Sequence, residues 1–182
     1  AFPAAFNAVK KQPIKLIPGC EGYLIDETQV VTDEDDRSID DTIVVLDFES
    51  TGLDTLKDRV IEIGAVKMTG GTLVDTLSIL VNPKIPLRPK ITEITGITDM
   101  MLADKETAET AIPKLMDFIG DAAIAAHNAA FDGKRLKAEL RRLGREFNAP
   151  ILDTLSLSRK LLPELKSFKL KSVCKALSVS LK

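Results

Sequence analysis

The sequence predicts an α/β domain with a mixed central sheet and helices on both faces. Strand-like stretches follow one another directly over residues 42–83, which is typical of antiparallel neighbours. Strand-like and helix-like stretches alternate after residue 110, which is typical of parallel strands joined through helices. The 182 residues, of which 45% are apolar and 29% charged, are enough for one domain with a buried core.

The composition argues against several classes of protein. No apolar run approaches the ~20 residues that a membrane span needs, and the N-terminus lacks the pattern of a signal peptide. Cys20 and Cys174 are the only cysteines and lie far apart, as in a reducing cytoplasm rather than a disulfide framework. The net charge of −2 means that any nucleic-acid site is local, with positive charge supplied by a bound cation. We therefore expect a cytoplasmic protein without membrane contact.

The first 40 residues are expected to form a segment of their own. Residues 1–12 indicate a short helix, and residues 14–26 indicate one or two short strands. An acidic, turn-rich stretch follows, which is typical of a linker. We therefore place a boundary near residue 40 and a larger domain over residues 41–182. The chain begins without Met and ends without a tail-like composition, so we expect a piece of a longer protein.

The first elements of the larger domain follow from their residue patterns. The apolar, β-branched run at residues 42–48 predicts a central strand. Residues 59–83 are rich in β-formers on both sides of Gly70 and Gly71, which predicts a hairpin. The proline-interrupted stretch at residues 84–98 predicts a loop.

A helix is expected after this loop, and strands and helices then alternate. Thr110 is placed to cap that helix, Pro113 lies in its first turn, and Gly120 ends it. The remaining expected elements are a strand at 122–128, a helix at 131–144, a strand at 149–152, a helix at 153–162 capped by Asp153, and a helix at 170–177.

Two acids end the central strand. Residues two apart in a strand point to the same face, so Asp47 and Glu49 lie side by side. Both faces of residues 42–48 are otherwise apolar, and we expect a strand that is covered on both sides. Two carboxylates ~5 Å apart repel by about 3 kcal/mol at an effective dielectric of ~20, and a bound Mg²⁺ or Mn²⁺ would relieve this. The alternative is that the strand reaches solvent at Asp47 and both acids are merely exposed.

A third acid follows the small-residue strand. That strand ends at His127 and Asn128, and Asp132 lies in the first turn of the next helix. With Asp47 and Glu49, Asp132 could bracket two metal ions ~4 Å apart, the arrangement used in phosphodiester cleavage. The alternatives are an aspartate that complements the helix dipole and a histidine with a structural role.

Four segments of the chain resemble a known family. VVLDFESTGLD and AHNAAFD resemble the first two motifs of the DEDD (DnaQ-like) 3′→5′ exonucleases, the proofreading branch of the ribonuclease H-like fold. Ser50 stands where threonine is commoner in the first motif. ITEITGIT and ILDTLSLSR resemble the stretches between and after these motifs. The resemblance covers residues 41–182 in the family's order and implies the ribonuclease H-like fold.

The resemblance implies a metal-dependent 3′→5′ exonuclease that proofreads single-stranded DNA ends. It implies that Asp47, Glu49 and Asp132 are catalytic ligands of two Mg²⁺ or Mn²⁺ ions. Asp153 resembles a position that is usually structural, in agreement with its predicted capping role. The residues that would hold the 3′-terminal nucleotide or line its site are Ser50, Thr51, Gly52, Leu53, Asn128 and Phe131.

The N-terminal stretch AVKKQPIKLIPGCEGYLID resembles the edge of a PHP (polymerase and histidinol phosphatase) domain. An exonuclease that follows such a segment is the arrangement of PolC-type DNA polymerase III alpha subunits. The resemblance implies three partners: a single-stranded DNA 3′ end, the PHP and polymerase domains of a longer chain, and replisome components. Glu21 resembles a PHP metal ligand, which would be orphaned here; the alternative is an exposed strand acid.

The chain departs from the family after its last predicted helix. The third motif, with a His or Tyr general base and a fourth acid, should follow LKSVCKALSVSLK, where the sequence stops. His127 is the only histidine and belongs to the second motif, and Tyr23, the only tyrosine, lies in the PHP-like segment. We therefore expect a domain truncated before its third motif, with weak or absent activity. A stand-alone exoribonuclease and a non-catalytic docking module of the same fold stay open as alternatives.

Overall fold

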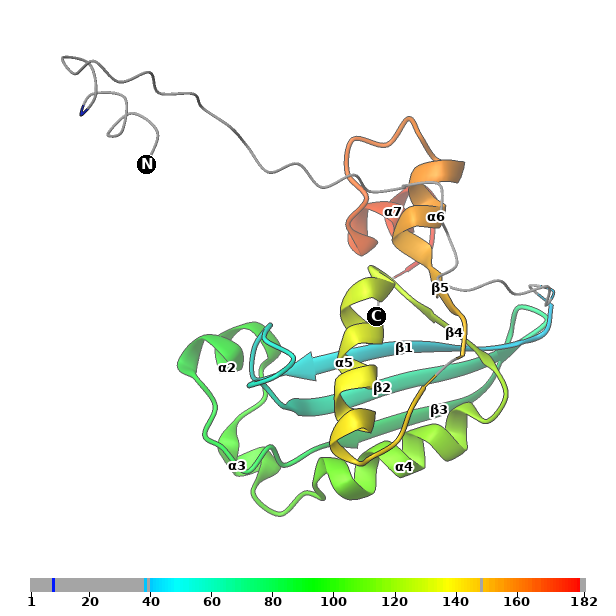
Figure 1. The fold of residues 1–182 in the computed structure, drawn as a ribbon. Coiled ribbons are helices and arrows are strands. Elements are labelled where there is room, and N and C mark those ends of the chain that lie inside the picture. The colour runs from blue at the N-terminus through cyan, green and yellow to red at the C-terminus, as the bar shows by residue number, and fades with distance from the viewer. Residues whose placement is uncertain (1–7, 9–37, 39, 148, 181–182) are drawn as a thin grey trace.

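The computed structural model describes residues 8, 38, 40–147 and 149–180 (Figure 1). The predictions for the N-terminal segment, including Glu21, lie outside the described residues, apart from the helical Ala8. The boundary near residue 40 stays a prediction. From Thr42 onward the chain forms a sheet flanked by helices, as the sequence predicts.

The sheet has five strands in the order β3-β2-β1-β4-β5, so β1 lies in the middle. β1 pairs antiparallel with β2 and parallel with β4. The outer pairs follow the same division, with β2 and β3 antiparallel and β4 and β5 parallel, which confirms the mixed sheet. The strands are β1 (Thr42–Ser50), β2 (Val60–Thr69), β3 (Thr72–Leu80), β4 (Ala123–Ala126) and β5 (Ile151–Asp153).

The predicted hairpin joins β2 to β3. Gly70 and Gly71 connect Thr69 to Thr72, which are register partners. The two glycines have φ angles of 55° and 74°. Two successive residues with positive φ match the twist of antiparallel strands, and glycine adopts that conformation without strain.

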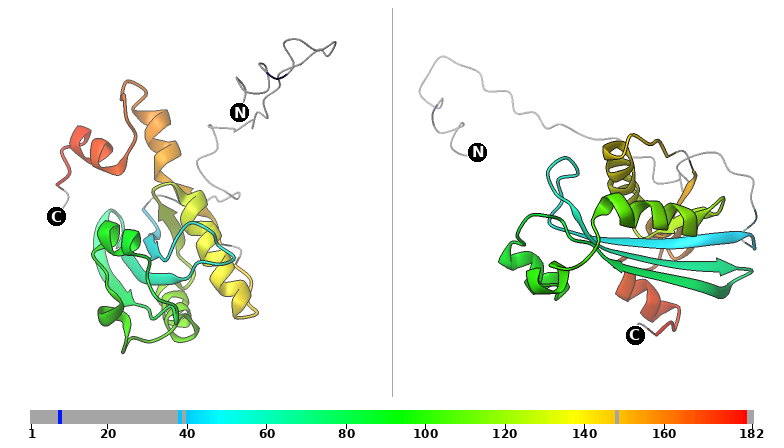
Figure 2. Two further views of the ribbon diagram at one scale, coloured as in Figure 1. Left: turned by 90° about the vertical axis from the view of Figure 1, so that its left-hand side faces the viewer. Right: turned by 90° about the horizontal axis from the view of Figure 1, so that it is seen from below.

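Helices cover both faces of the sheet, as predicted. α4 and α5 contact each other and the strands on one face, and α7 lies on the opposite side of the strands from α4 (Figure 2). α2 and α3 lie beyond the carboxyl end of β1 (Figure 1). The helices are α2 (Pro89–Thr95), α3 (Asp99–Leu102), α4 (Ala108–Ile119), α5 (Ala129–Arg142), α6 (Thr154–Leu161) and α7 (Leu170–Ala176).

The two faces of β1 differ in burial, which corrects the expectation that both are covered. Val44, Leu46 and Phe48 are buried in the main core. On the other face Val45 is 38% exposed, and Asp47 is exposed as well. α6 and α7 do not close over this part of the strand but border a cavity of about 580 Å³, which Val45 and Asp47 also line.

The stretch at residues 84–98 is not the loop that its prolines suggested, because it contains α2 and leads into α3. Pro89 occupies the start of α2, where its missing N–H costs nothing and its fixed φ favours the helix. Gly96 ends α2 with a φ of 75°, and its N–H bonds to the carbonyl of Thr92. Thr98 then caps α3 by accepting from Met101 N.

The predicted cap of α4 was also misplaced. The helix begins at Ala108, with Thr107 in the N-cap position, so Thr110 lies inside it. Pro113 therefore falls within the helix rather than in its first turn. An earlier start buries Ala111 and Ile112 completely, which outweighs the backbone hydrogen bond that the proline removes. The predicted stop at Gly120 is confirmed.

Candidate active site

The candidate site forms where the carboxyl end of β1 meets the start of α5. β1 pairs with β4 only over Ile43–Val45, so β1 continues beyond its parallel neighbour. On that side the N–H of Phe48 has no strand to bond. The carboxylate of Asp132 takes this place, with Oδ1 accepting from Phe48 N at 3.1 Å. Asp132 is thereby fixed against the strand between the positions of Asp47 and Glu49.

Like charges crowd at this point. Asp132 is 4% exposed, and its burial, with a further contribution from the Asp47 carboxylate, raises its pKa from 3.8 to about 7. The pKa of Glu49 is raised too, chiefly by burial and then by the charges of Asp47 and Glu62. A raised pKa means that ionising the group costs free energy in the folded protein. The three predicted acids therefore do lie within electrostatic reach of one another.

Glu62 is a fourth acid that the sequence reasoning missed. It lies on β2 directly opposite Glu49 in the antiparallel register, on the same face of the sheet. Gly64 lies opposite Asp47 and has no side chain to cover it. The alternating pattern VIEIGAV already placed Glu62 and Gly64 on the face opposite to Ile61 and Ile63. Only the register with β1 shows which acid Glu62 adjoins.

Among the described residues, these acids have no basic partner. Over residues 40–147 and 149–180, no lysine or arginine forms an ion pair with Asp47, Glu49, Glu62 or Asp132. In the same residues, no three His, Cys, Asp or Glu side chains form a group that could hold a metal ion. The acids are neighbours rather than a closed cage. Their oxygen donors and mutual repulsion nevertheless fit a hard divalent cation shared between them.

A pocket of about 580 Å³ lies beside the acids and gathers most of the predicted substrate-binding residues. Thr51 and Asn128 are not among the residues that line it. One wall comes from α2, which the sequence reasoning had treated as a loop. The lining residues used below are Glu49, Ser50, Gly52, Leu53, Phe131, Ile91 and Ile94.

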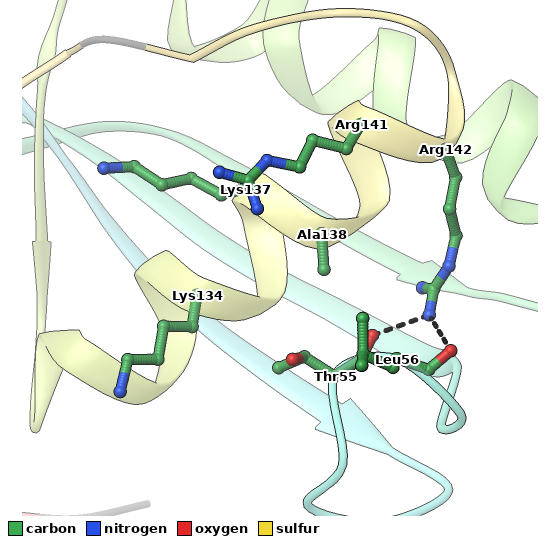
Figure 3. Close-up of a pocket in the computed structure, with 7 residues that line it drawn as sticks. All are labelled: Thr55, Leu56, Lys134, Lys137, Ala138, Arg141 and Arg142. Atoms are coloured by element: carbon green, nitrogen blue, oxygen red, sulfur yellow. Dashed lines mark hydrogen bonds between the residues drawn. The ribbon is translucent and has the colours of Figure 1, made fainter.

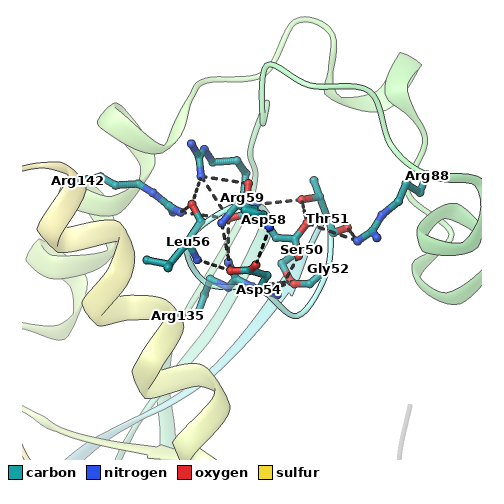
Figure 4. Close-up of polar contacts among 11 residues, drawn as sticks. Ser50, Thr51, Gly52, Asp54, Leu56, Asp58, Arg59, Arg88, Arg135 and Arg142 are labelled. Atoms are coloured by element: carbon teal, nitrogen blue, oxygen red, sulfur yellow. Dashed lines mark hydrogen bonds and ion pairs between the residues drawn. The ribbon is translucent and has the colours of Figure 1, made fainter.

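Buried polar contacts hold the turn that borders this pocket (Figure 4). Arg135 of α5 is fully buried and donates through Nη2 to the carbonyl of Gly52 at 2.7 Å and through Nη1 to that of Asp58 at 2.9 Å. Thr51 donates its hydroxyl to Asp58 Oδ1 at 3.1 Å, which explains why it faces away from the pocket. Ser50 donates to the Gly52 carbonyl at 2.7 Å. The side chains of Ser50 and Thr51 thus shape the turn.

Gly52 lies close to the ends of two side chains. A Cβ there would overlap with Arg88 Nη2 and Asp58 Oδ2. Any larger side chain would push these groups apart. The glycine therefore allows Arg88 and Asp58 to close around the turn.

Asp153 has the structural role that the sequence predicts. Its Oδ1 accepts from Leu155 N at 2.9 Å, which caps α6. The same oxygen accepts from Asn128 N at 3.0 Å and Ala129 N at 3.3 Å, at the start of α5. One carboxylate thus joins the ends of two helices.

His127 is also engaged in structural contacts. Its Nε2 lies 2.9 Å from the carbonyl of Phe168, and its Nδ1 lies 3.1 Å from Thr154 Oγ1. Because a carbonyl only accepts, Nε2 is assigned as the protonated nitrogen. With both ring nitrogens occupied, His127 connects β4 to the residues around α6 rather than offering a free base.

Fold and site together define a nuclease: a mixed sheet whose central strand ends in crowded carboxylates beside an open pocket. The chain belongs to the exonuclease family, since the model of that family (RNase_T) matches residues 44–181. Exonucleases of this family generally use divalent metal ions.

Relatives match over the whole chain. It is 45% identical over 182 residues to the PolC-type DNA polymerase III of Clostridium perfringens, and 39% identical over 185 residues to that of Bacillus subtilis. Each match covers all of this chain but 13% of the relative, so the chain spans about an eighth of those polymerases. The resemblance to the exonuclease of PolC-type polymerases is confirmed.

Solved structures support the same fold. Exonuclease X in complex with 5′ overhanging duplex DNA matches with a TM-score of 0.63 and 28% identity, covering 77% of this chain and 75% of that one. Product-bound exonuclease I has a TM-score of 0.69 at 19% identity over 78% of this chain and 39% of that one, a likeness of fold alone. The predicted ribonuclease H-like fold is confirmed.

In the described part of the chain, no helix is long and apolar enough to cross a membrane.

Proposed function

We propose that the chain is a proofreading 3′→5′ exonuclease that removes nucleotides from single-stranded DNA ends. One observation carries the proposal: Asp132 is buried against Phe48 N, beside Asp47 and Glu49, with its pKa raised to about 7. A fold gains nothing from crowding carboxylates in this way. The arrangement is useful if a cation and a phosphodiester bind there.

Asp47, Glu49 and Asp132 would hold two Mg²⁺ or Mn²⁺ ions in this proposal, with Glu62 near Glu49. Bound metal would supply an activated water and neutralise charge on the leaving oxygen. The contact from Phe48 N keeps Asp132 in one orientation, so the site needs little rearrangement. The base that would take the proton of water belongs to the third motif expected from the family resemblance.

The pocket beside the acids would receive the terminal nucleotide. Phe131 and Leu53 offer surfaces for a base or sugar, and Ile91 and Ile94 of α2 close the other side. Apolar walls accept any of the four bases, which suits an enzyme that removes whatever nucleotide is mispaired. Gly52 keeps the turn narrow, and Arg135 fixes its carbonyl so that it does not swing into the pocket.

We propose further that this exonuclease works as part of a replicative polymerase. The support is the match to PolC-type DNA polymerase III over the whole chain. Residues 1–40 would then be the edge of a PHP domain and residues 41–182 the exonuclease domain, and the partners would be the polymerase domains and replisome components.

Mn²⁺ titration by calorimetry and cleavage of a labelled single strand test the proposal together. Asp47→Asn and Asp132→Asn should each weaken Mn²⁺ binding by more than about 100-fold, because even groups behind metal ligands contribute 10–100-fold. Asp75→Asn, an exposed acid on β3, is the matched control and should bind as the wild type does. Unchanged Mn²⁺ binding in both site variants would overturn the proposed metal site.

Cleavage is measured on DNA and RNA strands of equal sequence. Preference for RNA would favour the exoribonuclease alternative, and failure to bind Mn²⁺ would favour the docking module. Strong cleavage that Asp47→Asn abolishes would show that the acids present suffice, and that the expectation of weak activity was wrong.

A further inference from the structure

α5 carries a basic surface on the side away from the acids. Lys134, Lys137, Arg141 and Arg145 recur at spacings of three and four, which places them on one face of the helix and the turn after it. Lys134, Arg141 and Arg145 are exposed, and Lys137 is half-buried. The whole chain has a net charge of −2, so this concentration of cations is local. We call these four residues the α5 basic surface.

The surface is hollowed rather than smooth (Figure 3). A hollow of about 380 Å³ lies between α5 and the loop residues Thr55 and Leu56, with Lys134, Lys137 and Arg141 along it. A second hollow of about 230 Å³ shares Lys137 and Arg141 and adds Arg145. Glu146 lines the second hollow as well, so one acid lies among the cations.

The cations of the α5 basic surface have no partner in the described part of the chain, unlike their neighbour Arg142. Arg142 pairs with Glu139 and donates to the carbonyls of Thr55 at 2.7 Å and Leu56 at 3.0 Å, as the dashed lines of Figure 3 show for the loop. Within the described residues, the side chains of the α5 basic surface make no ion pair or hydrogen bond. Arg142 therefore secures the loop, while the other cations remain available to a ligand.

The surface is separate from the catalytic pocket. Successive residues of a helix turn by about 100°, so Lys134, Lys137 and Arg141 lie on the side of α5 opposite to Asp132. Arg141 also lies about 13 Å further along the helix axis than Asp132, at a rise of 1.5 Å per residue. None of the four residues lines the pocket beside the acids. A ligand of this surface is thus not the nucleotide being cleaved.

We infer that the α5 basic surface binds the phosphodiester backbone of nucleic acid outside the catalytic pocket. The inference rests on the proposed function, which brings DNA to this molecule. A row of unpaired cations two helical turns long matches a polyanion with regularly spaced charges better than a single small anion. The bound phosphates belong either to the single strand upstream of the 3′ end or to the duplex behind it.

Fluorescence anisotropy in EDTA, where no cleavage occurs, tests the inference with the full chain. The variant is Lys137→Gln with Arg141→Gln. The matched control is Lys171→Gln with Lys175→Gln, two exposed cations at the same spacing on α7, on the other face of the sheet. The probes are oligothymidines of about 4 and about 20 nucleotides and a duplex with a short 3′ overhang.

The α5 variant should bind the long strand or the overhang duplex more weakly, with a salt slope smaller by about 0.7 for each lost phosphate contact on a single strand. Binding of the short strand should not change, and neither should Mn²⁺ binding, which is measured separately by calorimetry without EDTA. The probe with the larger loss identifies the source of the phosphates.

Three outcomes would overturn the inference: equal losses in the variant and its control, no loss in the α5 variant, or no binding of any probe by the wild type. The second outcome would leave an acidic protein surface as the partner. A chain that binds the long strand through α5 but neither binds Mn²⁺ nor cleaves would overturn the proposed function instead, so the two failures are distinguishable.

Discussion

Two neighbouring regions of the molecule balance charge in opposite ways. In the turn between β1 and β2, Arg135 and Arg88 hold the carbonyls of Gly52 and Thr51 and lie beside Asp58. At the end of β1 itself, within the described residues, the crowded carboxylates have no basic side chain paired with them. The first region contains its own cations, whereas in the proposed function the second binds a cation from solution.

The difference distinguishes charges that stabilise the turn from charges that are available for catalysis. A cation that donates to main-chain carbonyls fixes their positions, as the buried Arg135 does for the turn. Charges left unneutralised raise each other's pKa and favour binding of an ion. Because Asp132 and Arg135 lie one turn apart on α5, the same helix positions both regions. The four predictions below test this division, from the largest expected effect to the smallest.

Removing the buried arginine should cost the most stability. Arg135→Met leaves the carbonyls of Gly52 and Asp58 without their donor and removes a buried charge. We expect a loss of about 2–5 kcal/mol in the free energy of unfolding, measured in urea, because each buried acceptor left without a donor costs about 1–3 kcal/mol. Arg141→Met, the same change at an exposed position of α5, should stay within about 0.5 kcal/mol. Similar losses in the free energy of unfolding for both variants would show that Arg135 does not hold the turn.

Ionisation of Asp132 should destabilise the metal-free protein as pH rises. The pKa of an ordinary aspartate is 3.8, and that of Asp132 in the folded protein is about 7. Between pH 3.8 and about pH 7 the folded protein therefore binds a proton that the unfolded chain has lost. The free energy of unfolding therefore falls as pH rises through this range, by about 2–4 kcal/mol.

Urea unfolding in EDTA at a series of pH values measures this fall, taken as wild type minus Asp132→Asn. The asparagine keeps an oxygen that can accept from Phe48 N and does not ionise. Added Mn²⁺ should flatten the difference. A difference that rises with pH in EDTA would contradict the prediction.

Gly52→Ala should disturb the turn by steric overlap. The added Cβ would overlap with Arg88 Nη2 and Asp58 Oδ2, so both side chains must move. We expect the free energy of unfolding to fall by about 1–3 kcal/mol, and the terminal nucleotide to bind more weakly. Gly64→Ala is the control, since its Cβ would lie 3.8 Å from the Asp47 carbonyl, an ordinary contact. Urea unfolding of both variants provides the measurement.

Arg88→Met should have the smallest effect, although Arg88 belongs to the same network as Arg135. Its side chain is 65% exposed, and its contact with Asp58 at 3.4 Å is a surface ion pair. Such pairs contribute less than about 1 kcal/mol to stability. A loss as large as that of Arg135→Met would show that burial is not what distinguishes the two arginines.

Much of the fold follows from local patterns. The apolar run before Asp47 predicts the central strand, and Gly70 with Gly71 predicts the hairpin, because each signal lies within a few neighbouring residues. The failure to predict α2 also has its cause in a local pattern. The prolines of residues 84–98 suggest a loop, whereas Pro89 lies at the start of a helix, where proline is favourable.

The site was predictable only in part. The two motifs indicated that Asp47 and Asp132 would meet, and the structure places Asp132 against β1. The position of Glu62 beside Glu49 depends on strand register, which no short segment specifies. The exposure of Val45 depends on how far α6 and α7 extend over the sheet, a property of tertiary packing alone.

The bond from Phe48 N to Asp132 gives the site a built-in reporter. Most main-chain amides of a sheet bond to other main-chain groups, whose charge never changes. Here the acceptor titrates and is a candidate ion ligand, so the environment of one amide proton follows the state of the site. In a proton–nitrogen correlation spectrum of the nitrogen-15-enriched protein, the Phe48 resonance should move as Asp132 ionises and again as Mg²⁺ binds, with no substrate or turnover required.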